Sequence, residues 1–392
     1  MQILGVARTL PFHSIGGMQA IAWDLFKEFA RLGHTVTVLT TAIPGKPTPF
    51  TEDGVRVVPL PGSTPERSNA YWWKASAQWF IDNSAAQVDG VLSISAAGAS
   101  IAVQRRHAPQ ASFIFQAHGT SWGEIVSKWR TRRPLQIAKS VRNVYWLFKD
   151  AFVYRDFDRI ALVGDVLHHQ FHTPPVSWMT RGVKTVLIRN GVNEHVFKPD
   201  AQKRTNERSA LGWSATHRVA VFAARLHPQK GGEVALRSFA SLRAELPEAR
   251  LLIVGGGEDL ERLKNLSQTL GCEDRVHFTG PVARERMAPL LAAGDAFAFP
   301  TLRQEGLPMN VLEALSAGLR PVCSEDTRNV FDPSLPIEYA DPQDIPSFSA
   351  ALSKALRMGS SASSLLSPTY FLSHCALQYL NALKPANTHS HV

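Results

Sequence analysis

Residues 299–314 read FPTLRQEGLPMNVLEA, in which an apolar strand end runs through a Gly-Leu-Pro turn into the start of a helix. Two carboxylates, Glu305 and Glu313, lie eight residues apart on either side of that turn. A helix N-terminus attracts phosphate, and an ionised carboxylate only accepts hydrogen bonds, which suits hydroxyl groups. The stretch therefore predicts a site for a ligand that combines phosphate with hydroxyls, as a sugar nucleotide does.

The order of strand, turn and helix recurs along both halves of the chain. Apolar or β-branched runs predict strands, and apolar residues at helical spacing predict helices. The expected strands are 3–7, 34–41, 55–59, 88–93, 112–116, 160–163, 218–223, 251–254, 276–278, 296–299 and 319–323; the expected helices are 18–32, 231–246, 258–270 and 284–293. Strands that alternate with helices predict an α/β fold of doubly wound parallel sheets.

A length of 392 residues suits two domains. The turn-like Asn190-Gly191 predicts a boundary between domains 1–190 and 191–367, followed by a polar loop at 200–208. Apolar positions at helical spacing predict a C-terminal helix within 368–384, and the polar residues 385–392 are expected to be disordered.

The chain is basic, with a formal charge of +9, which favours anionic partners. Residues 122–149 interleave aromatic rings with cations, and this pattern suits an acidic membrane surface. A solvated helix with inward-facing rings explains the same pattern. No nucleic-acid recognition module is found, so nucleic acid is not an expected partner. The cations are Lys128, Arg130, Arg132, Arg133, Lys139, Arg142 and Lys149.

Three cysteines share no short motif, so neither a zinc site nor a disulfide framework is predicted. No run of 18 apolar residues and no signal-peptide pattern occurs. These features predict a cytoplasmic protein, and the basic stretch adds the option of a peripheral position on the inner face of the plasma membrane.

Three segments together resemble the retaining glycosyltransferases of the GT-B fold, family 4 (glycosyl transferases group 1). They are the paired glutamates, residues 224–232 (ARLHPQKGG) and residues 188–192 (IRNGV). Gly16-Gly17 and His118-Gly119 fall where that family places functional groups. The resemblance implies two Rossmann-like domains facing across a cleft. The N-terminal domain would bind the acceptor, the C-terminal domain would bind the nucleotide sugar, and the last helix would return to the N-terminal domain.

Arg225 and Lys230 follow a strand at the ligand edge of a sheet, where cations suit a leaving diphosphate. The resemblance implies that these two, with His118 and Glu305, form the catalytic group, and that Glu313 holds the ribose. It also assigns nucleotide-sugar contacts to Gly16, Gly17, Asn190, Gly256, Pro281, Val282, Gly306, Leu307, Pro308 and Met309. For Gly16-Gly17 and for Gly255–Gly257, a purely structural turn remains the alternative.

No metal-ligand set or Asp-x-Asp motif is found, so we expect a metal-independent reaction with no cofactor besides the nucleotide-sugar substrate. The expected activity is retaining transfer of a sugar from a UDP- or GDP-sugar to a hydroxyl of a glycan, glycolipid or lipid-linked acceptor. The alternatives are a non-catalytic sugar-nucleotide-binding protein and a GT-B sugar-nucleotide epimerase. One departure from the family is residues 323–330 (CSEDTRNV), which lack its glycine-rich loop.

Overall fold

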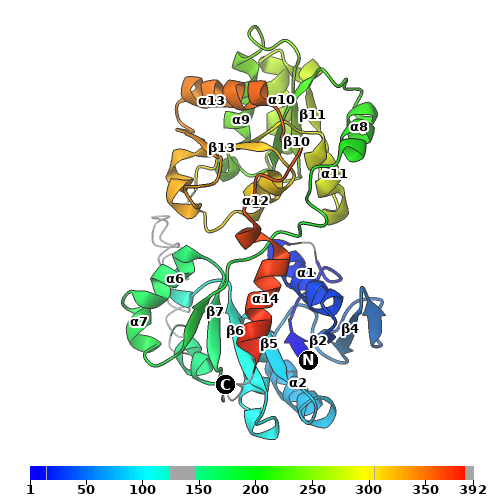
Figure 1. Cartoon of the computed structure of the whole chain (residues 1–392), viewed down its shortest axis with the longest axis vertical. Coiled ribbons are helices and arrows are strands. Elements are labelled where there is room, and N and C mark those ends of the chain that lie inside the picture. The colour runs from blue at the N-terminus through cyan, green and yellow to red at the C-terminus, as the bar shows by residue number, and fades with distance from the viewer. Residues whose placement is uncertain (15, 124, 126–146, 148, 304, 385–392) are drawn as a thin grey trace, which may run out of the picture. The chain divides into compact units, whose positions relative to one another are not determined.

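The computed structural model describes residues 1–384 apart from 15, 124, 126–146, 148 and 304. The chain divides into two compact units (Figure 1). The N-terminal unit comprises Met1–Gly191 and the residues from Leu372 onward, and the C-terminal unit comprises Val192–Phe371. The division after Gly191 falls beside the turn at which the sequence predicts a boundary.

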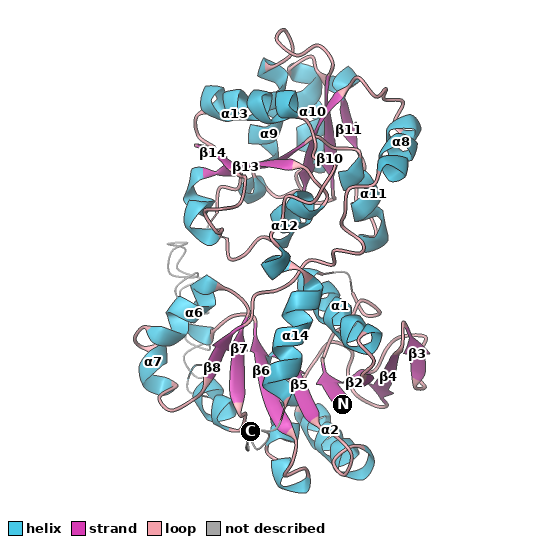
Figure 2. Ribbon diagram, viewed as in Figure 1, coloured by secondary structure: helices cyan, strands magenta, loops and turns pink. Residues whose placement is uncertain are grey.

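The N-terminal unit is built on one sheet with the strand order β3-β4-β2-β1-β5-β6-β7-β8 (Figure 2). All neighbouring pairs are parallel except β3 with β4. The strands are β1 (Gln2–Val6), β2 (Thr35–Thr41), β3 (Phe50–Glu52), β4 (Val55–Leu60), β5 (Gly90–Ile94), β6 (Ser112–Ala117), β7 (Arg159–Leu162) and β8 (Thr185–Leu187). The sequence analysis missed β3 and β8, two three-residue strands with no fully buried side chain.

Helices cover this sheet, and the red C-terminal helix in Figure 1 lies among the blue and cyan elements from the start of the chain. The α-helices are α1 (Gly17–Arg31), α2 (Ala70–Asn83), α3 (Ala99–Ala102), α6 (Asp165–His172), α7 (Val176–Met179) and α14 (Leu372–Leu383), with 3-10 turns η1 (Ser95–Gly98) and η2 (Arg105–His107). The C-terminal helix begins at Leu372, because Pro368–Tyr370 form a separate 3-10 turn, η7.

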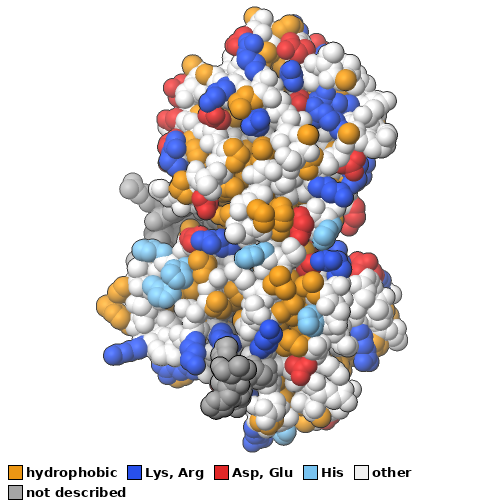
Figure 3. Space-filling model, viewed as in Figure 1, with side chains coloured by type: hydrophobic (Ala, Val, Ile, Leu, Met, Phe, Trp, Pro, Cys, Tyr) orange, Lys and Arg blue, Asp and Glu red, His pale blue; other side chains and the backbone are white. Residues whose placement is uncertain are grey.

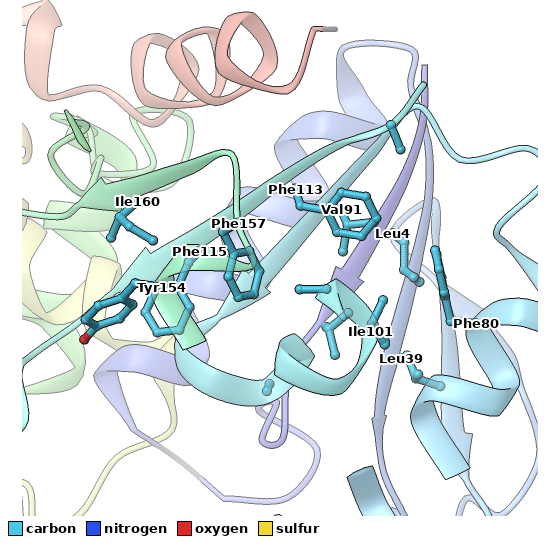
Figure 4. Packing of buried hydrophobic residues seen from close by; sticks show 14 of the residues in the cluster. Leu4, Leu39, Phe80, Val91, Ile101, Phe113, Phe115, Tyr154, Phe157 and Ile160 are labelled. Carbon is cyan, nitrogen blue, oxygen red and sulfur yellow. The ribbon is translucent and has the colours of Figure 1, made fainter. Parts of the chain in front are cut away.

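Aromatic packing fixes the core between this sheet and its helices. Phe115 of β6 meets Tyr154 at 5.1 Å and Phe157 at 5.3 Å between ring centroids, both edge to face. Phe80 of α2 meets Phe113 at 6.2 Å in the same way. Figure 4 shows these rings with the aliphatic side chains Leu4, Leu39, Val91, Ile101 and Ile160 around them. Such packing holds the strand that carries His118 at its end.

The C-terminal unit has a wholly parallel sheet in the order β11-β10-β9-β12-β13-β14. Its strands are β9 (Arg218–Ala223), β10 (Ala249–Val254), β11 (Val276–Phe278), β12 (Ala296–Phe299), β13 (Arg320–Ser324) and β14 (Glu338–Ala340). The chain runs from β9 to β11 in one direction and then returns to place β12 on the other side of β9. In open α/β sheets ligands bind at such a switch point, outside the carboxyl ends of the strands.

The helices of this unit pack on both faces of the sheet (Figure 2). The α-helices are α8 (Ala201–Ala210), α9 (Gly232–Ser241), α10 (Leu260–Thr269), α11 (Met287–Ala292), α12 (Met309–Ser316) and α13 (Ile345–Met358), with 3-10 turns η3 (Pro228–Lys230), η4 (Glu273–Arg275), η5 (Arg284–Arg286) and η6 (Glu325–Val330). The region 323–330, which departs from the family pattern, thus forms the end of β13 and η6.

The prediction of a loop at 200–208 is wrong, because these residues begin helix α8. Asp200 caps the helix by accepting a hydrogen bond from Lys203 N at 2.9 Å. Two charged side chains of the helix are buried in ion pairs: Glu207 with Arg286 and Arg208 with Asp295, each at 2.7 Å. A polar composition indicates a loop only when the charges face water, and here tertiary pairing buries them.

Candidate active site

The predicted site residues divide between the two units, and each group is described by itself. In the C-terminal unit, loop 224–230 leaves β9 and packs on the turn that follows β10. Leu226 N donates to Gly256 O at 2.9 Å, and Asp259 N donates to Leu226 O at 3.2 Å. A Cβ on Gly255 or Gly257 would stand 2.1 Å from a carbonyl oxygen of this loop, and both glycines have positive φ. The triplet is therefore a structural support of the loop.

Glycine at position 231 lets the same loop approach the loop after β12. Gly231 has a φ of +76°, and a Cβ there would stand 1.8 Å from Pro300 O. Leu302 N donates to Gln229 O at 2.9 Å across the same contact. The two loops, which leave neighbouring strands at the switch point, are thus held together by backbone.

This contact brings Lys230 to Glu305. The Lys230 Nζ lies 2.6 Å from Glu305 Oε1. Thr301 Oγ1 donates to the same oxygen at 3.1 Å, and Arg303 Nε lies 3.6 Å from it. Glu305 Oε2 takes part in none of these contacts. The sequence analysis named Lys230 and Glu305 but missed Thr301, which stands four residues before the glutamate without a motif of its own.

Arg225 stands apart from this cluster. Its side chain is exposed, and among the described residues it makes no hydrogen bond or ion pair. An exposed guanidinium at the carboxyl edge of the sheet is available for an anionic group.

The segment after Glu305 leads into α12. Gly306 is exposed, its φ is not positive, and nothing lies within 4 Å of the place a Cβ would take. Leu307, Pro308 and Met309 are half-buried, and Pro308 is the N-cap residue, with no side-chain cap. Asn310 Nδ2 donates to Ala223 O at 2.9 Å, which ties the first turn of α12 to the end of β9.

Glu313, on α12, has its own cationic partner. Its carboxylate is almost fully buried, and Arg284 Nη2 lies 2.6 Å from its Oε1. The Arg284 guanidinium also lies 5.1 Å from the ring centroid of Phe197, a cation–π distance. The sequence analysis missed Arg284, because nothing in its local sequence marks it as the partner of a residue 29 positions away.

Pro281 and Val282 follow β11, the strand that pairs with β10. Pro281 is exposed and Val282 is half-buried. Gly255 N donates to Gly280 O at 3.1 Å, and a Cβ on Gly256 would stand 3.0 Å from Pro281 Cδ. Gly256 and Pro281 therefore pack against each other beside loop 224–230, and Val282 follows them in the chain.

In the N-terminal unit, Gly16 and Gly17 form the start of α1. Gly16 is the N-cap residue in extended backbone, and no side chain caps this end of the helix. Gly17 is exposed, and nothing lies within 4 Å of a Cβ placed there. Neither the backbone conformation nor a neighbouring atom requires glycine at position 17.

His118 follows the end of β6, and Gly119 beside it is exposed. The Nε2 atom of His118 lies 2.9 Å from Gln116 Oε1. Burial of the ring lowers the pKa of His118 to about 4, because the charged form loses its hydration. The imidazole is therefore neutral at pH 7.

Asn190 lies at the end of the N-terminal unit, where its backbone N donates to Val163 O at 3.3 Å. The side chain is buried, and its Oδ1 has no hydrogen-bond partner within the described ranges.

Most of the basic stretch 122–149 and all of the tail 385–392 lie outside the described residues. Of the rest, no helix has both the length and the apolar composition needed to cross a membrane. Nor do three or more His, Cys, Asp or Glu side chains gather as a metal site would require, again within the described positions. Figure 3 shows acidic and basic side chains interspersed on the visible face of the C-terminal unit.

Comparison with known proteins agrees with this arrangement. The family described as glycosyl transferase 4-like domain matches residues 16–191. The family described as glycosyl transferases group 1 matches residues 203–333, which include Arg225, Lys230, Glu305 and Glu313.

Two curated relatives share part of the sequence. A GDP-mannose-dependent alpha-(1-6)-phosphatidylinositol monomannoside mannosyltransferase of Mycolicibacterium smegmatis is 37% identical over 127 residues, covering 31% of this chain and 32% of that protein. A D-inositol 3-phosphate glycosyltransferase of Streptomyces scabiei is 31% identical over 199 residues, covering 44% of each chain. The chain thus matches about a third to under a half of the length of these relatives.

Solved structures share the fold along nearly the whole chain. Sucrose-phosphate synthase from Thermosynechococcus elongatus aligns with a TM-score of 0.65 at 17% identity, covering 99% of this chain and 96% of that one. HepE of Anabaena, solved with UDP and glucose, aligns with a TM-score of 0.68 at 17% identity, covering 98% and 99%. These likenesses show the GT-B fold, and the two family matches show the family: this chain belongs to the GT-B-fold glycosyltransferases of group 1, family 4.

Proposed function

We propose that this chain is a retaining, metal-independent glycosyltransferase that moves a sugar from a UDP- or GDP-sugar to a hydroxyl of a glycan, glycolipid or lipid-linked acceptor. The observation that carries the proposal is the contact of Lys230 with Glu305 at 2.6 Å. Both residues stand in loops that leave neighbouring strands at the switch point of the sheet. A cation and a carboxylate beside an uncapped helix start suit a ligand with both phosphate and hydroxyls.

In this proposal the cations act on the leaving group. Negative charge builds on the diphosphate as its bond to the anomeric carbon breaks, so a fixed cation stabilises the transition state more than the ground state. Glu305 and the loop contact at Gly231 hold Lys230 in place. Arg225 adds a planar guanidinium that can bind two phosphate oxygens at once.

The carboxylates take the hydroxyls. Glu305 Oε2, which joins none of the three contacts that Oε1 makes with Lys230, Thr301 and Arg303, would accept from a hydroxyl of the transferred sugar. Glu313, whose Oε1 lies 2.6 Å from Arg284 Nη2, would accept from the ribose. The exposed backbone at Gly306 and the edge at Pro281-Val282 would pack on the sugar and the base.

The relatives guide the choice of substrates to test. One is named for GDP-mannose and a phosphatidylinositol mannoside, and another for D-inositol 3-phosphate. HepE was solved with UDP-glucose. GDP-mannose and UDP-glucose are therefore the first donors, with inositol-containing acceptors.

The experiment measures nucleotide release from a panel of UDP-, GDP- and ADP-sugars, with and without EDTA, using Lys230→Ala as the control for contaminating activity. Proton NMR of the product then reads its anomeric configuration. We expect release to survive EDTA and the configuration to be retained. Measurable donor binding without release from any donor would favour a non-catalytic binding protein. An inverted product would contradict retention, and loss of activity in EDTA would contradict metal independence.

The proposal also places residues 122–149 at an acidic membrane surface on the cytoplasmic side. Neutralising Arg130, Arg132 and Arg133 should weaken sedimentation with phosphatidylserine vesicles while leaving nucleotide release from a soluble donor intact. Unchanged sedimentation would remove the membrane from the proposal.

A further inference from the structure

His118 is the last member of a short hydrogen-bond chain that begins in the C-terminal helix. Gln116 Nε2 donates to Tyr379 Oη at 2.8 Å, and Gln116 Oε1 lies 2.9 Å from His118 Nε2. Gln116 and Tyr379 are both fully buried. Gln116 is also a polar residue near the end of a strand, SFIFQA, whose other long side chains are apolar.

The chain dictates the protonation of the ring. An amide oxygen only accepts hydrogen bonds, so a contact with Gln116 Oε1 requires a proton on His118 Nε2. Because burial lowers the pKa of His118 to about 4, the ring carries a single proton at pH 7. Its Nδ1 therefore keeps a lone pair and can only accept.

We propose that Gln116 and Tyr379 are positioning residues that hold His118 as the neutral Nε2–H tautomer, so that Nδ1 accepts a hydrogen bond from a substrate hydroxyl. The inference rests on the proposed function, because it takes His118 to contact the sugar. If Gln116 served only to pair with the hydroxyl of Tyr379, its removal would not change the tautomer of His118.

The inference makes the C-terminal helix part of the support of His118. Tyr379 is 263 positions from Gln116 in sequence. The end of α14 is fixed to the same sheet by Arg159 Nη1, which donates to Ala382 O at 2.5 Å, and by Ser112 Oγ, which donates to Lys384 O at 3.1 Å. The tyrosine hydroxyl is thereby held at a constant place beside β6.

The first test compares Tyr379→Phe with Tyr71→Phe in the full-length chain. Tyr71 lies in the same unit, and its hydroxyl donates one hydrogen bond to Pro61 O at 2.7 Å. Tyr71→Phe therefore also removes one hydroxyl hydrogen bond, but not one in the chain that reaches His118. Nitrogen-15 NMR of labelled histidines, with the His118 signals assigned by their loss in His118→Asn, reads the tautomer directly. We expect a pure Nε2–H pattern in the natural protein and in Tyr71→Phe, and a mixture in Tyr379→Phe. Sugar transfer by Tyr379→Phe should fall roughly tenfold, the scale of one buried hydrogen bond.

The second test replaces the amide. In Gln116→Glu the introduced carboxylate still accepts from His118 Nε2 and can accept from the tyrosine hydroxyl. Its charge should raise the pKa of His118 and move the acid limb of the pH–rate profile upward. Gln116→Leu should lose the tautomer preference, and circular dichroism shows whether that variant folds.

Two results would overturn the inference: an Nδ1–H tautomer in the natural protein, or unchanged His118 signals and transfer in Tyr379→Phe. The NMR arm needs no substrate, so it remains decisive if no donor is ever turned over. If the NMR results agree with the prediction but the natural protein transfers no sugar, the result would instead count against the proposed function.

Discussion

Lys230 and Glu305 form an ion pair, with Nζ 2.6 Å from Oε1. The lysine is therefore preorganised by the carboxylate that would bind the transferred sugar. Lys230→Ala should lower kcat about 100- to 1,000-fold, the cost of removing one preorganised charge-stabilising group. Steady-state kinetics with a donor that the nucleotide-release panel identifies measures this change.

The matched control is Lys264→Ala. Lys264 also pairs with a glutamate, Glu261, at 2.8 Å in the same unit, but both side chains are exposed. Its removal should leave kcat unchanged. A near-normal rate in Lys230→Ala would refute the role given to that lysine.

Most strands of both sheets were predictable because parallel strands buried on both faces are continuous apolar runs, but the short strands β3, β8 and β14 were missed. Residues 218–223 coincide with β9, and 296–299 coincide with β12. The motif residues at their carboxyl ends could therefore be placed at the ligand edge from sequence alone.

What sequence could not predict are contacts made by tertiary packing between distant residues. The pairing of Arg284 with Glu313 and the support of Gln116 by Tyr379 have no local pattern. Helix α8 was missed for the same reason, since its buried charges are satisfied by Asp295 and Arg286 from later in the chain.

Alanine substitutions of Gly306 and Gly257 distinguish a glycine that contacts the ligand from one that the fold requires. A Cβ on Gly306 would meet nothing within 4 Å, and its φ is not positive, so Gly306→Ala should change the free energy of unfolding by less than about 0.5 kcal/mol. The donor KM should rise about tenfold or more, because the added methyl blocks close approach of the substrate to the backbone.

Gly257→Ala should instead change the stability of the fold. A Cβ there would stand 2.1 Å from Leu226 O with φ at +154°, so the free energy of unfolding should fall by more than about 1 kcal/mol. Urea unfolding and donor titration of both variants measure these effects. An unchanged KM in Gly306→Ala would argue against backbone contact with the donor.

Removal of the buried carboxylate of Asp295 should lower the free energy of unfolding of the C-terminal unit strongly. This carboxylate accepts from Arg204 at 2.5 Å, from Arg208 at 2.7 Å and from Val219 N at 2.8 Å, and both Asp295 and Arg208 are buried. Asp295→Ala should cost about 3–5 kcal/mol, because it leaves a buried guanidinium without its carboxylate. Urea unfolding monitored by circular dichroism measures the loss.

Glu245→Ala is the control for that variant. Glu245 pairs with Arg357 at 2.7 Å, but both side chains are about half exposed. Its removal should change the free energy of unfolding far less than Asp295→Ala does, because solvent screens an exposed ion pair. Equal losses in the two variants would show that burial of the ion pair has no influence on its worth.

His118 should make stability depend on pH between its folded and unfolded pKa values. The folded pKa is about 4, below the ordinary 6.5, so the unfolded chain binds a proton that the folded protein refuses. Stability should therefore be undiminished above pH 6.5 and should fall, by up to about 3 kcal/mol from this group, as the pH drops toward 4. The measurement is urea unfolding at several pH values for the natural protein and for His118→Gln, which has no proton to gain. The difference between the two curves should grow in the stated direction across that window, and a difference that stays constant from pH 7 to 4 would contradict the lowered pKa of this histidine.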